Sequence, residues 1–591
     1  MRYDLIIKNA YVIDGSGAKG FNADVAVKDG VIAFVGTLAE DAAAEESVDA
    51  GGKCLVPGFI DAHSHADLAA ARYPGMENYL VQGITTVFAG QCGMGVAPSE
   101  HFSLGMVEDG TRIGPGVQRR IREYYGSSTS PVALAAEKDV IDSLYRECYG
   151  VEKDWGDWAS YEKSLENRGL GTNMILLVGH GALRAEVLGT GCERAASPEE
   201  TDRICDLLDR SMKQGASGLS FGFDYAPGSY AKEDELLRLA QVVADNGGVL
   251  AAHVQFSPRR GAETVADFQP IDGYRELLEL GLRTGARVQL SHLRCGYKPV
   301  PDVEAGSRYA RAVTDLIDEY RAKGVEAGWD VLPNYTDAGT FEPMLASKFP
   351  ALLEECGSLT AFEEKLRTGE GFAECLRRAE NGEGGGMIPR MPRWAESYVV
   401  RQCKDPGLCG KTIEQIAKDS GTQPLEAALR LLRDDVRTCV SMHHPDGELR
   451  GFDWYIGRPD VSVGLDVGSS PLDCQLETRP DMPPVYNGGW ADFAGTAWMI
   501  CRNRHLPKEH LIASLTGNTA KNLGLSDRGL VRPGFKADLV MIDWDKYGDN
   551  VDYVHPNRGP SGIERVWVNG IPAAERGRPL NAGAGRILDI K

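Results

Sequence analysis

The sequence predicts an α/β fold with a parallel sheet, together with a small β domain to which both ends of the chain contribute. Three observations support this prediction. Apolar strands alternate with amphipathic helices through the middle of the chain, short strands with turn residues occupy both ends, and single polar residues stand at the carboxyl ends of central strands. Because parallel strands need long crossover connections, usually helices, this alternation favours a parallel sheet.

The composition is that of an ordinary globular protein. The chain has 591 residues, of which 42% are hydrophobic and 25% charged, so disordered and fibrous classes are excluded. With 64 Lys and Arg against 85 Asp and Glu, the formal net charge is −21, which argues against a nucleic-acid partner because such a partner needs a basic face. The 13 Cys are odd in number and scattered, as expected of free thiols in a reducing compartment.

The first residues, MRYDLIIKNAYVIDGSG, do not have the pattern of a secretory signal. Asp4, Lys8 and Asn9 interrupt the apolar run, and no small-residue cleavage site follows. No stretch approaches the roughly 18–20 uninterrupted apolar residues of a membrane span. We therefore expect a cytoplasmic protein with no membrane partner, and the oligomeric state is left open.

Both ends of the chain have the texture of short strands. Residues 4–13, 25–27 and 31–36 have the pattern of short strands, and Asp29-Gly30 is a strong hairpin signal. Residues 537–543 and 563–570 repeat this pattern. Neither end has enough sheet to bury a face alone, so we expect the two ends to pair in one β domain.

The middle of the chain alternates between strands and helices. A strand at 174–178 precedes a helix at about 198–214 with Ile204, Leu207, Leu208 and Met212 at helical spacing. Strands near 217–221, 248–253 and 287–292 then alternate with helices near 233–246 and 272–284. Such a sheet either closes into a barrel or stays open and doubly wound. Against the doubly wound sheet, no Gly-rich phosphate loop follows an early strand, so nothing favours nucleotide binding.

Two histidines mark the end of the first central strand. Residues 59–65 read as a strand, and the period of two places the side chains of His63 and His65 on one face. Two imidazoles on one face can hold a divalent cation, although an isolated pair is more often two hydrogen-bonded histidines.

Further side chains able to bind a metal end other apolar strands. They are Cys92, His253, His292 and Asp466. The carboxyl ends of parallel barrel strands share one rim, where such enzymes carry their active sites. Zinc takes imidazole nitrogen, thiolate and carboxylate ligands, and a carboxylate beside an activated water can move its proton. We therefore predict a zinc site at this rim with Asp466 as the proton-transferring residue.

Several motifs of the chain resemble those of a known family. The motifs are PGFIDAHSHAD (57–67), QGITTVFAGQCGMGVAP (82–98), GHGALR (179–184), GASGLSFGFDYAPG (215–228) and LTGNTAKNLGLSDRGLVRPGFKADLVMID (515–543). They are similar to those of the amidohydrolase superfamily and, within it, of the N-acyl-D-amino-acid deacylases, or D-aminoacylases.

The resemblance implies a (β/α)8 TIM-like barrel with a small composite β-sandwich from both termini. It implies a sandwich over 1–57 and 525–591 and a hydrolase barrel over 58–524. The barrel is enlarged by insertions at about 101–165 and 341–405. The second insertion is compatible with a cover over the barrel mouth, or with a surface loop. It also implies that Cys92, His253 and His292 hold one tightly bound Zn²⁺. A second, weaker divalent ion would lie at His63, His65 and Asp466 and share Cys92, and the sequence leaves open whether one or two ions bind.

The resemblance further implies residues that bind the substrate. Arg294 stands two positions after His292, where the deacylases carry a basic residue for the substrate carboxylate. Tyr225 and Tyr335 match positions that line the family's pocket, and His180 in GHGALR is expected at the rim. The family's His-Pro-Arg segment after the last strand has no counterpart in register.

The sequence therefore predicts a zinc-dependent amidohydrolase that cleaves an N-acyl-D-amino acid or a similar N-acyl compound into a carboxylate and a free amino acid. The alternative is a cyclic-amide hydrolase of hydantoinase or dihydroorotase type, which Cys92 in place of a carboxylated lysine disfavours. A catalytically silent binding protein would have no use for the full set of metal-binding residues.

Overall fold

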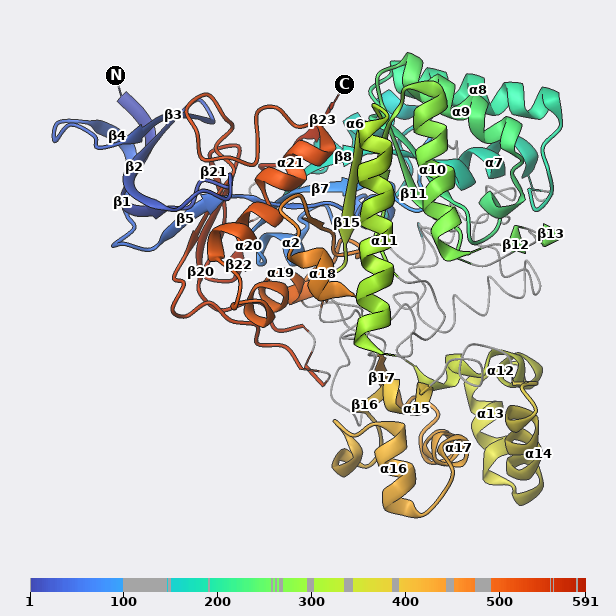
Figure 1. Ribbon diagram of the computed structural model, residues 1–591. Coiled ribbons are helices and arrows are strands. Elements are labelled where there is room, and N and C mark those ends of the chain that lie inside the picture. Colours follow the sequence, from blue (N-terminus) through green and yellow to red (C-terminus); the bar gives the residue numbers. More distant parts are fainter. Residues whose placement is uncertain are drawn as a thin grey trace.

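The structure is a computed structural model of the chain (Figure 1). It describes residues 2–98, 146, 150–189, 192–256, 259–260, 263–264, 269–294, 302–333, 344–384, 393–442, 451–472, 491–552, 554–555, 557–580 and 583–590. Tyr335 and most of the enlargement predicted at 101–165 lie outside these residues.

The two ends of the chain form one sheet of nine strands. The N-terminal strands are β1 (Arg2–Val12), β2 (Phe21–Lys28), β3 (Val31–Gly36), β4 (Ala43–Asp49) and β5 (Cys54–Pro57). The C-terminal strands are β19 (Leu539–Ile542), β20 (Ile563–Val568), β21 (Ile571–Glu575) and β22 (Arg578–Pro579). The order is β22-β21-β20-β19-β5-β1-β2-β3, with β4 beside β1, so the expected pairing of the two ends is present, while its description as a sandwich domain stays a prediction.

The join between the two ends is an antiparallel pair. In it Val56 of β5 lies opposite Val540 of β19. The predicted hairpin joins β2 to β3, and both of its turn residues have positive φ, 51° at Asp29 and 71° at Gly30, as a two-residue hairpin turn requires. A side chain at Gly30 would meet the carbonyl oxygen of Asn569 at 2.7 Å, so glycine also lets the two ends pack closely.

Nine short parallel strands form the centre of the molecule. They are β6 (Phe59–Asp61), β7 (Ile84–Ala89), β8 (Asn173–Leu176), β9 (Val178–Gly179), β10 (Gly218–Gly222), β11 (Val249–His253), β14 (Arg287–Leu290), β15 (Ala327–Val331) and β18 (Ser462–Val463). Their ladders form two groups, β18-β15-β14-β11-β10-β9 and β8-β7-β6, with β23 (Ile587–Leu588) added beside β8. The α/β class with parallel strands is confirmed, whereas a single closed barrel stays a prediction.

The last and first parallel strands nevertheless contact each other where both end. Ala62 donates its N–H to the carbonyl oxygen of Val463 at 3.1 Å, and Asp466 donates to that of His63 at 2.8 Å. Ser64 forms a parallel bridge with Val467. The segments after β6 and β18 are therefore held together, which brings residues 400 positions apart in sequence to one place.

Helices cover the outer side of these strands (Figure 1). The longer ones are α7 (His180–Leu188), α8 (Pro198–Lys213), α9 (Glu233–Asp245), α10 (Pro270–Thr284), α11 (Val303–Ala322) and α19 (Ala491–Arg502), and shorter ones are α1 (Asp67–Ala70), α2 (Glu77–Leu80), α6 (Trp158–Asn167), α18 (Phe452–Ile456), α20 (Lys508–Ser514) and α21 (Gly517–Leu523). The helix predicted at 198–214 is α8. Ser197 and Glu200 cap its first turn, and Ile204, Leu208 and Met212 are buried, as the helical spacing predicts.

Residues 344–384 and 393–442 form a lobe with its own core. It contains α12 (Pro350–Cys356), α13 (Leu359–Arg367), α14 (Gly369–Glu380), α15 (Trp394–Ser397), α16 (Ile413–Ser420), α17 (Pro424–Asp434) and the antiparallel pair β16 (Tyr398–Gln402) and β17 (Cys439–Met442). Its apolar cluster is separate from that of the strands. In Figure 1 the lobe lies beside the N-terminal end of α11 and extends away from the sheets. It continues well beyond residue 405, where the sequence places the end of the insertion, and its role as a cover stays a prediction.

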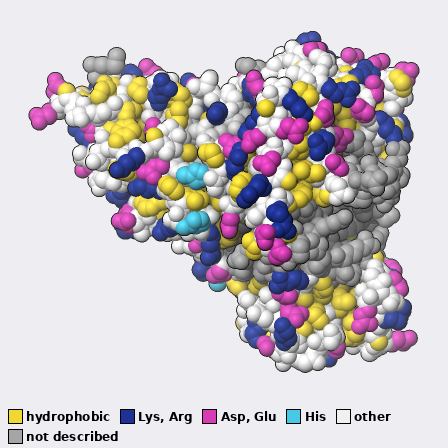
Figure 2. All heavy atoms as spheres, in the orientation of Figure 1, with side chains coloured by type: hydrophobic (Ala, Val, Ile, Leu, Met, Phe, Trp, Pro, Cys, Tyr) yellow, Lys and Arg dark blue, Asp and Glu magenta, His cyan; other side chains and the backbone are white. Residues whose placement is uncertain are grey.

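On the face shown in Figure 2, acidic and basic side chains are interspersed over the described residues. Among the described helices, none combines the length and the apolar character that a membrane crossing would demand.

Candidate metal centre

Each predicted metal-binding residue lies at or just after the end of a parallel strand. His253 is the last residue of β11, and the others follow their strands by two to four residues: His63 and His65 follow β6, Cys92 follows β7, His292 follows β14 and Asp466 follows β18. The prediction of one continuous strand over 59–65 is wrong, because β6 ends at Asp61. The Asp61 carboxylate accepts the N–H of His63 at 3.1 Å and that of Leu465 at 2.8 Å, so these two N–H groups bond to a side chain and not to the backbone of a neighbouring strand.

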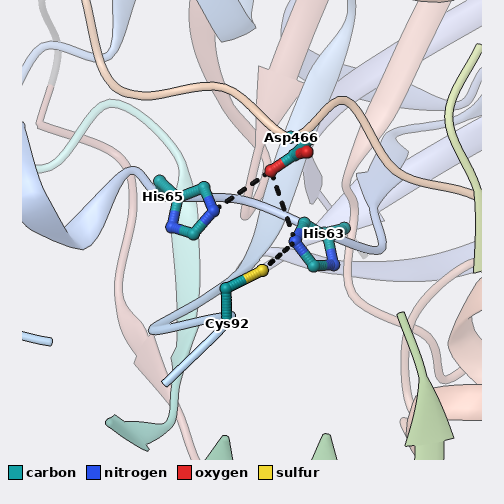
Figure 3. A group of neighbouring side chains, drawn as sticks. All are labelled: His63, His65, Cys92 and Asp466. Atoms are coloured by element: carbon teal, nitrogen blue, oxygen red, sulfur yellow. Dashed lines mark hydrogen bonds and ion pairs between the residues drawn. The ribbon is translucent and has the colours of Figure 1, made fainter. Parts of the chain in front are cut away.

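The structure brings His63, His65, Cys92 and Asp466 together (Figure 3). One carboxylate oxygen of Asp466 is 3.4 Å from Nε2 of His63 and 3.1 Å from Nε2 of His65. The sulfur of Cys92 is 3.3 Å from Nε2 of His63. Four donor atoms of the kinds that bind divalent metals therefore lie within 4.8 Å of one another.

A second group shares Cys92. Its sulfur is 3.9 Å from Nδ1 of His253 and 3.5 Å from Nε2 of His292. The three donor atoms of this group also lie within 4.8 Å of one another, and all three residues are buried. The two groups correspond to the two sets that the sequence predicts, and they meet at one thiol.

The backbone at these residues is constrained. Cys92, His292 and Asp466 have φ values of 58°, 37° and 59°, in a region that costs a non-glycine residue about 1–3 kcal/mol and is found preferentially at functional sites. Close packing is equally demanding: a side chain at Gly464 would stand 2.4 Å from Cβ of His63.

Opposite charges shift the pKa values of the first group. Burial alone would lower the pKa of the imidazoles, but the hydrogen bond to Asp466 raises that of His65 to about 10, and the charges of Cys92 and Asp466 raise that of His63. Burial opposes ionisation of Asp466 and Cys92 as well, yet His63 lowers the pKa of both. The group therefore favours a thiolate and a carboxylate, the ionised forms that bind metals.

Three buried carboxylates lie behind the first group, and the sequence analysis gives them no role. They are Asp61, Asp67 and Asp330, and burial raises their pKa values to about 7, 6 and 6 respectively. Asp330 accepts the N–H of His292 at 2.8 Å and faces Nδ1 of His63 at 3.9 Å, while Asp67 accepts the N–H of Gly90 at 2.9 Å. Their signal in the sequence is their place beside the ligands, in Ile60-Asp61-Ala62-His63, in His65-Ala66-Asp67 and at the end of a strand.

Of the residues predicted to bind substrate, Arg294 and Tyr225 contact the second group. Nη2 of Arg294 is 3.1 Å from Nε2 of His253, and the guanidinium lies 4.7 Å from the centre of the Phe256 ring. Tyr225 packs edge-on against His253, and its hydroxyl donates to the carbonyl oxygen of Cys92 at 2.5 Å. In this position the Tyr225 hydroxyl supports the Cys92 backbone, and a contact with substrate stays a prediction.

His180 is fully buried in a different cluster. Its Nε2 is 2.8 Å from Glu235, whose two oxygens also accept from Arg184 at 2.6 Å. The ring packs on Phe221 at 5.1 Å. The contacts of His180 with Glu235 and Phe221 hold the ring within this cluster, and its predicted role toward substrate stays a prediction.

The donor atoms suit zinc. Two imidazoles and a thiolate form one group, and two imidazoles, a carboxylate and the same thiolate form the other. Imidazole, thiolate and carboxylate are the usual zinc ligands, and three protein ligands with a further open position are typical of catalytic zinc sites. The residues present therefore fit the metal.

Comparison with known proteins defines the class of this chain. The profile described as Amidohydrolase family matches residues 46–297. D-aminoacylase of Alcaligenes xylosoxydans xylosoxydans is 25% identical over 99% of this chain and 97% of its own length, and N-acyl-D-glutamate deacylase of the same organism is 27% identical over 99% and 96%. The fold and these relatives define a metal-dependent hydrolase acting on carbon–nitrogen bonds other than peptide bonds.

The solved structures agree. N-acyl-D-glutamate deacylase from Bordetella bronchiseptica, complexed with zinc and a phosphonate that mimics the tetrahedral reaction intermediate, is 25% identical with a TM-score of 0.64 and covers 100% of both chains. The chain is thus similar to the amidohydrolase family over residues 46–297, and its full-length relatives include a D-aminoacylase and an N-acyl-D-glutamate deacylase.

Proposed function

We propose that this protein is a zinc-dependent amidohydrolase that cleaves the amide bond of N-acyl-D-amino acids, releasing a carboxylate and a free amino acid. The observation that carries the proposal is the convergence of His63, His65, Cys92, Asp466, His253 and His292 on two groups that share one thiol. The full-length similarity to deacylases of N-acyl-D-amino acids supports the substrate class.

In this proposal the ligands divide as the resemblance implies. Cys92, His253 and His292 hold the tightly bound zinc ion, and His63, His65 and Asp466 border a second, weaker site. A bound zinc ion supplies a Lewis acid that polarises a carbonyl group and activates water. The same reading places the site in a closed (β/α)8 barrel spanning 58–524, with 1–57 and 525–591 as the composite domain.

Asp466 is the residue that moves the proton. Its side chain is 23% exposed, whereas that of His63 is fully buried and that of His65 is 8% exposed, so a substrate can reach its carboxylate. The two imidazoles hold its pKa well below the usual range, which keeps it ionised at neutral pH as an acceptor. Asp466 takes a proton from the attacking water and delivers it to the leaving nitrogen.

Arg294 anchors the carboxylate of the substrate. It lies beside His253, and a guanidinium pairs with a carboxylate through two parallel hydrogen bonds. An anchor at this distance from the metal-binding residues would orient the acyl–nitrogen bond over the site.

A substrate screen tests the proposal. The purified protein, before and after treatment with a chelator and after reloading with zinc, is incubated with N-acetyl and N-formyl derivatives of D- and L-amino acids and with hydantoins. Release of amine from the D-derivatives, lost with the metal and restored by zinc, is the expected result. Turnover of hydantoins alone would replace the proposal by a cyclic-amide hydrolase, and no zinc-dependent release from any compound would reject it.

A further inference from the structure

The two ring nitrogens of His253 have different neighbours. Nδ1 faces the sulfur of Cys92 at 3.9 Å, within the candidate metal group. Nε2 points the other way, 3.1 Å from Nη2 of Arg294 and 4.0 Å from a carboxylate oxygen of Asp224. Tyr225 and Phe256 pack edge-on against the ring, with centroids 5.0 and 5.7 Å away, so the two nitrogens keep these directions.

The contact with Arg294 fixes the position of the ring proton. A guanidinium has five N–H donors and no acceptor. Nε2 of His253 must therefore accept from Arg294, and the proton of the neutral ring stands on Nδ1, toward Cys92. A metal ion on Nδ1 needs the lone pair of that nitrogen, and the ring proton then stands on Nε2. Because two donors cannot bond to each other, this Arg294 contact and metal coordination by Nδ1 exclude each other.

Asp224 is placed to accept the proton on Nε2. Its Oδ1 accepts the N–H of Phe256 at 3.2 Å, which fixes the carboxylate beside the segment that follows β11. Its Oδ2 faces Nε2 of His253, and an ionised carboxylate only accepts hydrogen bonds. The backbone of Arg294 is held by Tyr274, since its N–H donates to the Tyr274 hydroxyl at 2.9 Å and its carbonyl accepts from that hydroxyl at 3.0 Å, while its guanidinium lies over the Phe256 ring.

We propose that Asp224 is the positioning residue of His253. When a metal ion binds Nδ1, Nε2 gives up its hydrogen bond with Arg294 and donates its proton to a hydrogen bond with the Asp224 carboxylate. This inference rests on the metal site of the proposed function.

The zinc affinity of two variants, measured in competition with a chromophoric chelator, tests the proposal. One variant is expected to bind zinc more weakly than the unmodified protein and the other more tightly. In Asp224→Asn the amide keeps an oxygen for Phe256 and presents its NH2 to Nε2, so zinc binding should weaken about 10–100-fold, the usual cost of losing such a supporting carboxylate. In Arg294→Ala the competing contact is gone, so binding should tighten about 2–10-fold, the range for one hydrogen bond.

A matched control is Asp435→Asn, because Asp435 is a buried aspartate in the separate lobe that accepts the N–H of Arg437 at 3.1 Å. Its zinc affinity should equal that of the unmodified protein. An Asp224→Asn affinity within twofold of the unmodified protein, or weaker binding in Arg294→Ala, would overturn the proposal.

A crystal structure of the unmodified protein loaded with zinc gives an independent answer if Asp224→Asn fails to fold. Asp224 should lie within hydrogen-bond distance of Nε2, with Arg294 displaced. Zinc on Nδ1 with Arg294 still bonded to Nε2 would refute the proposal while leaving the proposed function intact. Failure of the unmodified protein to bind zinc would instead remove the proposed function itself.

Discussion

The two halves of the candidate metal centre share Cys92 but have different charged neighbours. The half formed by His63, His65 and Asp466 has three buried carboxylates around it, Asp61, Asp67 and Asp330. The half formed by His253 and His292 has the Arg294 guanidinium and the Asp224 carboxylate beside it. Burial disfavours the charged form of both imidazoles; the hydrogen bond to Asp466 overcomes it at His65, whose pKa is raised to about 10, whereas at His292 burial prevails and lowers the pKa to about 4.

Because of this difference, a metal ion must compete with a proton in one half and not in the other. A metal binds the neutral imidazole, so at neutral pH an ion at His65 must displace a proton whereas an ion at His292 need not. The carboxylates of the first half attract any cation, including the proton that competes with the metal. The comparison therefore supports the expectation that the ion held by Cys92, His253 and His292 is the tighter one.

The largest expected effect comes from Asp466→Asn. The substitution removes the proton acceptor while leaving Cys92, His253 and His292 unchanged. Turnover should fall by about 10²–10⁴-fold, the usual contribution of a positioned acid–base group, while the tightly bound zinc and the fold are retained. Turnover assays with metal analysis of the same samples measure both, and near-normal rates would reject the role of Asp466.

Cys92→Ala tests whether the two halves depend on one thiol. Because the sulfur faces donors in both groups, the variant should lose most of its bound zinc rather than one ion of two. Cys192→Ala is the matched control, since Cys192 is also fully buried and belongs to neither group. Its metal content should match that of the unmodified protein, and unchanged zinc in Cys92→Ala would mean that the thiol is only packed.

Single ligand substitutions separate the halves. His292→Asn should release the tightly bound ion, with affinity reduced at least 10–100-fold, the cost of losing even a supporting partner of a ligand. His65→Asn should leave that ion in place and abolish binding of the second. Isothermal titration with zinc after chelator treatment counts the ions, and equal losses in the two variants would show that the halves do not act as separate sites.

The candidate metal-binding residues can be predicted from the sequence because each stands at or just after the end of an apolar strand, where the rule for parallel barrels places functional residues. His253 and Asp466 are 213 positions apart, yet both were assigned to one rim from the strand pattern alone. The α/β class, the helix at 198–213 and the Asp29-Gly30 hairpin were equally accessible, since each depends on local chemistry.

The environment of the ligands could not be found in this way. The roles of Asp61, Asp330 and Asp224 follow from which backbone N–H or imidazole faces each carboxylate across the fold, and no local pattern encodes that. The strand over 59–65 was predicted too long because alternation does not show that Asp61 captures the N–H groups at its end. The separate core of 344–384 and 393–442 likewise depends on packing between helices that individually resemble any surface helix.

The smallest effect on the metal centre is expected from Glu235, the carboxylate of the buried cluster with His180 and Arg184. These partners overcome the opposing effect of burial and lower the pKa of Glu235 from 4.5 to about 2. Because the pKa is lower in the folded chain than in the unfolded chain, the ionised group stabilises the fold above pH 4.5, and this contribution is lost as the pH falls toward 2. Glu235→Gln should therefore lower the free energy of unfolding by about 3–5 kcal/mol at pH 7, because it leaves the Arg184 charge buried without its carboxylate.

Urea unfolding of both proteins between pH 3 and pH 7 checks this expectation, with zinc content measured alongside. The unmodified protein should lose stability toward pH 3 more steeply than the variant, and both should bind the same amount of zinc. Glu326→Gln is the control, since Glu326 pairs with Arg287 at 3.4 Å but is 76% exposed, and an exposed pair contributes about 0–1 kcal/mol. A loss of zinc in Glu235→Gln would instead tie His180 to the metal centre, and the cluster would then serve the site and not only the fold.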